Sequence, residues 1–208
     1  MKKSFFATLT VAAALAAVAT PSFAQVKLIT FNLEPNPKFL NCIKASSNGP
    51  APKAEVTVLR GKLNDTLVLR LKDFKPNLAF DLFTVQNSNL RSDGTVDPAF
   101  LNFGMAWYQS DVQVDNDGEG EVSIKTILLD QIFGFDPIVA LPPTNTFHVG
   151  FWFNDPKDAA ACGFDITKPT PFNGEHSAGP LAMISVPNPA TGIGPLCTNP
   201  GPGGTCHP

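Results

Sequence analysis

Two histidines and two carboxylates are the side chains best suited to metal chemistry in this chain. His148 and His176 belong to the part of the sequence expected to fold, and Asp155 and Glu175 stand close to them along the chain. Imidazole and carboxylate ligands together suit a transition metal. The commoner role for each His is to hydrogen-bond its neighbours, so a metal site of His148, His176, Asp155 and Glu175 is an alternative hypothesis.

A second group of residues has the chemistry of a ligand-binding edge. Trp152 offers an aromatic face on which sugars or apolar ligands stack. Asn173, Glu175 and His176 lie in a polar loop, residues 173–179, and residues 153–162 form another. We expect these two loops to form the edge that faces a ligand. Trp107 is the other aromatic candidate, although a buried role in the core is the commoner one for such a residue.

Hydrolytic chemistry has weaker support. The sequence lacks the GxSxG, HExxH and SxxK patterns of well-known nucleophile and metal sites, and we assign no catalytic residue. A pair of carboxylates, with Asp81 and Glu175 as candidates, remains an alternative. Asp81 interrupts a Phe-rich stretch, and we expect it to face solvent. The acidic stretch at 115–121 favours a hairpin turn over a weak calcium site.

The first residues have the pattern of an export signal. Lys2 and Lys3 precede an apolar stretch at 5–19, and Ser22-Phe23-Ala24 fits the small-x-small cleavage rule. This predicts a signal peptide over 1–24 and a secreted or periplasmic protein. No later apolar run is long and uninterrupted enough for a membrane span. We expect a β domain over 25–186 and an irregular tail over 187–208.

Four cysteines become informative in an oxidising compartment. Cys42, Cys162, Cys197 and Cys206 form an even set, which predicts two disulfides. Three pairings are possible, and we favour Cys42 with Cys162 and Cys197 with Cys206. A zinc site is the alternative, but the chain has no CxxC spacing.

The charge balance argues against nucleic acid as a partner. The formal net charge is −3, and only 16% of residues are charged, against about 25% in an average soluble domain. Without Lys2 and Lys3 the net charge would be −5. A nucleic-acid binder needs a basic face to neutralise phosphates. We expect neither a nucleic-acid partner nor a cofactor.

Period-two alternation of apolar and polar residues runs through most of the chain and is typical of half-buried strands. It predicts strands over 25–32, 54–59, 66–72, 78–86, 103–114, 121–129, 146–154 and 181–186, the fifth of them bent or bulged. One short helix is expected over 155–162. This pattern favours an all-β fold, an antiparallel β-sandwich of the Ig-like, Greek-key type with a Pro/Gly-rich tail. A small barrel is the nearest alternative.

Three strings carry a resemblance to other proteins. They are FGMAWYQSD at 103–111, TFHVGFWF at 146–153 with DPKDAA at 155–160, and TPFNGEHSAGP at 170–180. Together they resemble a group of exported bacterial β-domain proteins. The resemblance implies export and a compact β domain, brings no catalytic residues, and draws attention to His176 and Trp152. The stretch around His148 loosely resembles copper-zinc dismutases, but the chain lacks their His-x-His pair.

The sequence as a whole favours an exported, disulfide-stabilised binding or surface module without enzymatic activity, whose ligand it does not identify. Three alternatives stay open: a metal-binding protein that uses His148 and His176, a secreted hydrolase that uses carboxylates, and a structural component of the envelope.

Overall fold

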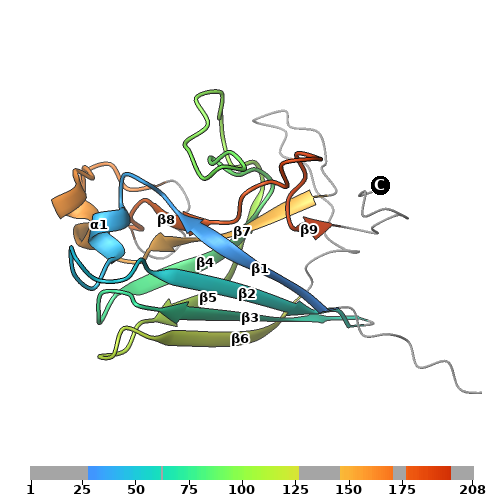
Figure 1. The fold of residues 1–208 in the computed structure, drawn as a ribbon, viewed down its shortest axis with the longest axis horizontal. Helices are drawn as coiled ribbons and strands as arrows, with labels where there is room; N and C mark the ends of the chain where they lie inside the picture. Colours follow the sequence, from blue (N-terminus) through green and yellow to red (C-terminus); the bar gives the residue numbers. More distant parts are fainter. Residues whose placement is uncertain (1–27, 62, 127–145, 171–176, 198–208) are drawn as a thin grey trace, which may run out of the picture.

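Nine antiparallel strands form the body of the chain in the computed structural model, which describes residues 28–61, 63–126, 146–170 and 177–197 (Figure 1). The strands are β1 (Leu28–Pro35), β2 (Lys53–Leu59), β3 (Asp65–Lys72), β4 (Ala79–Val85), β5 (Ala106–Gln113), β6 (Gly120–Thr126), β7 (Thr146–Phe153), β8 (Leu181–Ile184) and β9 (Leu196–Cys197). Two short helices accompany them, α1 (Leu40–Ile43) and the 3-10 helix η1 (Pro156–Cys162).

The strands form one continuous sheet in the order β5-β4-β7-β8-β1-β2-β3-β6, and β9 pairs with β7. β1 joins the two halves of the sheet, because its first six residues pair with β2 whereas Glu34 and Pro35 pair with β8. The sheet therefore curls until its end strands approach, and Thr126 in β6 donates a 2.7 Å hydrogen bond to Gln109 in β5. The all-β antiparallel prediction is confirmed. The two separate sheets of the predicted sandwich are instead parts of a single, nearly closed sheet, because β1 pairs with strands of both halves.

The alternating pattern places one face of every long strand in a common core. Leu67, Leu69 and Leu71 of β3 are buried on alternate positions, as period-two spacing requires. On the paired strands β4 and β7, the ring centroids of Phe80 and Phe151 lie 4.7 Å apart. Such tilted and edge-on aromatic contacts add to the stability that the buried apolar area supplies.

A second apolar cluster lies on the outer face of β4, β7 and β8. Phe83, Trp152 and Ile184 belong to it, and Phe103 packs against it from the loop after β4. The Trp152 ring is 1% exposed and meets Phe83 and Phe103 edge-on at 5.3 and 5.1 Å. Its indole is therefore covered by other rings instead of being presented to a ligand.

A disulfide ties the two helices together at one end of the sheet. Cys42 in α1 is bonded to Cys162 in η1, which confirms this predicted pair. The Asp155 carboxylate accepts a hydrogen bond from Lys157 N at 2.9 Å and caps η1, and Gly163 ends the helix in the left-handed conformation. The predicted Cys197–Cys206 bond lies outside the described residues.

Two local predictions on the β5–β6 hairpin hold. Asp115 accepts hydrogen bonds from Asp117 N and Glu119 N, both at 2.9 Å, so the acidic stretch forms a turn. Gly118 has φ of 80°, and a Cβ there would lie 2.5 Å from the Phe74 carbonyl oxygen. The expected bulge in β5 occurs at Gln109, which has no partner in the register with β4.

The ends of the chain are described only in part. The predicted signal peptide lies outside the described residues. Of the expected irregular tail, residues 188–192 are exposed, whereas Leu196 is fully buried and pairs with Phe147 of β7. No helix in the described ranges is long and apolar enough to cross a bilayer.

Candidate functional site

A cleft of about 570 Å³ lies between two loops at the end of the sheet where β7 begins. One wall is the β4–β5 loop, residues 86–105, and the other is the β8–β9 loop, residues 185–195. Thr146 and His148 of β7 line the cleft between them. Figure 1 shows both loops rising from the same side of the sheet, the first in green and the second in red. The volume is in the range of small-molecule sites.

The β8–β9 loop is an insertion into a strand that would otherwise be continuous. Ile184 pairs with Gly150, and the ladder along β7 resumes where Leu196 pairs with Phe147. Asn188 holds the loop, because its Oδ1 accepts from Ala190 N at 2.9 Å and from Thr191 N at 3.3 Å. The wall is therefore a folded turn of fixed shape.

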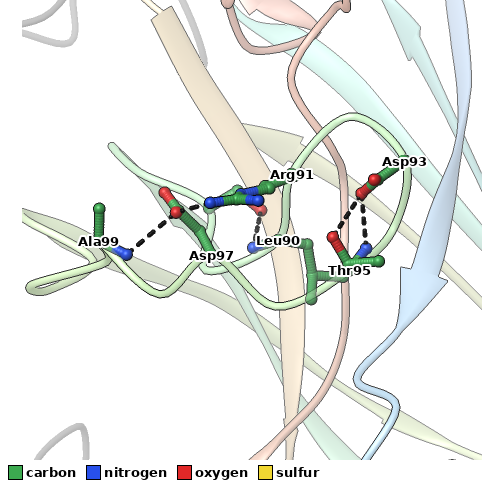
Figure 2. A network of polar contacts seen from close by, with 7 residues as sticks. Leu90, Arg91, Asp93, Thr95, Asp97 and Ala99 are labelled. Atoms are coloured by element: carbon green, nitrogen blue, oxygen red, sulfur yellow. Dashed lines mark hydrogen bonds and ion pairs between the residues drawn. The ribbon is translucent and has the colours of Figure 1, made fainter.

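The β4–β5 loop is also fixed by its own hydrogen bonds, several of which Figure 2 shows. Asp97 Oδ1 accepts from Ala99 N at 3.1 Å and from Arg91 Nε at 3.4 Å. Asp93 Oδ1 accepts from the hydroxyl and the backbone N–H of Thr95, which lowers the pKa of the Asp93 carboxyl. Both walls thus exist before any ligand arrives, which lowers the entropic cost of binding.

His148 is the titratable base of the cleft. Its Nδ1 lies 2.9 Å from the Ser185 carbonyl oxygen and 3.0 Å from Ser185 Oγ. Because a carbonyl oxygen only accepts, the shorter contact places the proton on Nδ1 and leaves a lone pair on Nε2. Burial lowers the pKa of His148 to about 4, against a smaller opposing effect of the Ser185 hydrogen bond. The ring is therefore neutral near pH 7.

The backbone approaches Nε2 closely from the β8–β9 loop. A Cβ added at Gly194 would lie 3.0 Å from His148 Nε2 and 2.5 Å from the Phe147 carbonyl oxygen. A larger residue at Gly194 would displace the loop from the imidazole. This glycine therefore sets the distance between His148 and the wall beside it.

The predicted metal ligands are only partly described. Asp155 caps η1 just after β7, whereas His148 lies near the start of that strand. An extended chain rises about 3.3 Å per residue, so these two positions are roughly 20 Å apart and do not share one ion. The described residues hold no group of three or more His, Cys, Asp or Glu side chains placed for a metal. His176 and Glu175, like the ligand candidate Asn173, lie outside the described ranges.

Asp81 is 3% exposed, so our expectation that it faces solvent is wrong. It points away from the main core, and Asn154 Nδ2 donates to its Oδ1 at 2.7 Å. Asp111 stands directly opposite it on β5 and accepts from the Tyr108 hydroxyl at 2.8 Å. Each carboxylate has a donor, which offsets the repulsion expected between like charges facing each other across two strands.

Sequence reasoning missed the residues that form the cleft walls. Arg91, Asn102 and Asn188 stand in stretches rich in Asn, Ser, Pro and Gly, the first of which we assigned to no element and the second to an irregular tail. Two such stretches that flank neighbouring strands are the available signal. Their meeting depends on the pairing of β7 with both β4 and β8, which no local pattern reveals.

Comparison of the whole chain with protein-family models, with curated proteins and with solved structures finds no match.

Proposed function

We propose that this chain is an exported binding module, without catalytic activity, that holds a small polar ligand in the cleft between the β4–β5 and β8–β9 loops. The observation that carries the proposal is a cleft of about 570 Å³ whose two walls are fixed by their own hydrogen bonds. A site with that volume and that degree of preorganisation suits reversible binding.

His148, which lines the cleft, and Ser185, which contacts it from below the lining, favour reversible binding over catalysis. The Ser185 hydroxyl is buried and accepts a hydrogen bond from Val149 N at 3.1 Å, so it is not placed to attack a ligand. His148 is fixed through Nδ1 and has a pKa of about 4, which makes it a poor general base near neutral pH. Its Nε2 lone pair remains suited to accept a hydrogen bond.

Export is supported by the pattern of residues 1–24 and by the disulfide between Cys42 and Cys162. Mass spectrometry of the chain expressed from Met1 in a bacterium tests this part. A product that begins at Gln25 outside the cytoplasm is expected. A product that retains Met1 in the cytoplasm would refute it.

Binding is tested by ligand-observed NMR with a mixed library of small sugars, acids and amino acids. Ala99 is exposed and lines the cleft, so Ala99→Trp should fill it. Ala160 is exposed on η1, at the end of the sheet that carries the disulfide, and Ala160→Trp is the matched control. Compounds that bind the unmodified chain should bind the Ala160 variant equally and lose binding to the Ala99 variant.

Two results would overturn the proposal. Equal binding to both Trp variants would place the ligand elsewhere. Chemical conversion of a bound compound, followed in the same NMR samples over hours, would show that the protein is a catalyst.

A further inference from the structure

We infer that the cleft is selective for a ligand with a single carboxylate group, bound through the terminal N–H groups of Arg91. This inference deepens the proposed function and rests on it. It follows from which donors and acceptors of the cleft walls the protein itself already occupies.

Three side-chain oxygens of the cleft-lining residues are occupied by backbone N–H groups of their own loops. Within the two loops, Asn102 Oδ1 accepts from Gly104 N at 2.9 Å, Ser88 Oγ from Leu90 N at 3.2 Å, and Asn188 Oδ1 from Ala190 N at 2.9 Å. A backbone N–H can only donate, so these contacts fix which end of each amide faces its own loop.

The hydrogen-bond donors of the same side chains are not used within the loops. The Nδ2 groups of Asn102 and Asn188 and the hydroxyl hydrogen of Ser88 have no acceptor among the described residues. All three residues line the cleft. An unused donor next to a ligand is satisfied by an acceptor oxygen, so the walls favour a ligand rich in such oxygens.

Arg91 adds the charge that makes a carboxylate the preferred acceptor. Asp97 engages only its Nε, at 3.4 Å, which leaves the two terminal nitrogens of the guanidinium without a described partner. The Arg91 side chain is 53% exposed and lines the cleft, so a ligand can reach it. A planar guanidinium with two free terminal groups matches a carboxylate by a bidentate pair of hydrogen bonds.

Asp97 also limits the charge of the ligand. It is the anionic residue lining the cleft beside Arg91, so the lining carries one positive and one negative charge. A dianion such as phosphate would meet the Asp97 carboxylate as well as the guanidinium, whereas a monoanion gains the pairing with less repulsion. His148, with its neutral ring and its lone pair on Nε2, adds an acceptor for a hydroxyl or N–H elsewhere on the ligand.

The test compares acids with their neutral counterparts. Galacturonate is measured beside galactose, benzoate beside benzamide, and inorganic phosphate as a dianion, all by NMR titration of the disulfide-bonded protein up to concentrations that detect a Kd of about 1 mM. Arg91→Gln removes the positive charge at the cleft and leaves Asp97 in place. Arg70→Gln is the matched control, because Arg70 forms an exposed ion pair with Glu121 on the other side of the sheet.

We expect at least one acid to bind the unmodified chain about tenfold or more tightly than its neutral counterpart and than phosphate. Arg91→Gln should remove that preference, and Arg70→Gln should keep it. If neutral compounds bind as well as acids, or if the Arg91 variant keeps the preference, the carboxylate inference is wrong while the binding function stands. If acids and neutral compounds alike fail to bind, the inference and the proposed function both fail.

Discussion

Acid should destabilise this fold through His148 in a way that a single substitution can isolate. The folded state holds the ring neutral with a pKa of about 4, whereas the unfolded chain has the ordinary value of 6.5. Between these two values the unfolded state binds the proton that the folded state excludes. Stability therefore increases with pH across this window, and it falls as the pH drops from 6.5 through 4.

The size of the effect follows from the difference between the two pKa values. A change from 6.5 to about 4 corresponds to about 3 kcal/mol, fully lost below the folded pKa. At pH 5 the same relation gives a loss of about 2 kcal/mol. The ring is 4% exposed, so solvent screening does not reduce these figures much.

The assay is urea denaturation of the unmodified chain and of His148→Asn at several pH values between 4 and 8, without reductant. An Asn amide can donate to the Ser185 carbonyl as Nδ1 does, but it does not titrate. Between pH 7 and pH 5, the free energy of unfolding of the unmodified chain should fall by about 2 kcal/mol more than that of the variant. Carboxylates contribute equally to both proteins, so the difference isolates His148.

If the free energy of unfolding changes with pH by the same amount in the two proteins, this reasoning is refuted. A second measurement follows the His148 ring protons by NMR. They should not titrate between pH 5 and pH 8, and a midpoint near the ordinary histidine value would show that the ring is solvated or paired differently.

Three further predictions concern the fold. Replacing Cys42 and Cys162 by Ser opens a loop with a sequence separation of 120 residues, and the free energy of unfolding should fall by about 4 kcal/mol in denaturation experiments; an unchanged value would mean that the disulfide adds nothing. Gln109→Ala removes bonds to Thr84 and Thr126 and should cost about 1–2 kcal/mol by the same assay, whereas no change would argue against the contact between the two end strands. Trp152→Ala should cost about 3–5 kcal/mol, measured by thermal and chemical unfolding, and a neutral result would mean that the ring is not packed as described.

Local patterns predicted the strands well because their signal is contained within each strand. Leu67, Leu69 and Leu71 alternate with polar residues, and that spacing requires a half-buried strand wherever it lies in the sheet. The cap at Asp155 and the end at Gly163 were predictable for the same reason, since both depend on neighbours within one turn. The short α1 helix lacks such a cap and was missed.

The curvature of the sheet and the cleft depend on pairings between distant strands. The pattern of β1 shows that it is a strand, but not that Leu33 pairs with β2 while Glu34 pairs with β8. Asp81 illustrates the same gap. Alternation placed it on the face away from the main core, as found, but a second apolar cluster on that face was not visible in the sequence.

The interruption of the ladder between β8 and β9 separates one wall of the cleft from the strands that support it. Both ends of the β8–β9 loop are anchored to adjacent positions of β7, at His148 through Ser185 and at Phe147 through Leu196. The segment between them can change in length without altering the register on either side, and doubling it costs only about 0.6 kcal/mol in closure entropy. One loop can therefore be exchanged for another at this position while the strands on either side keep their pairing.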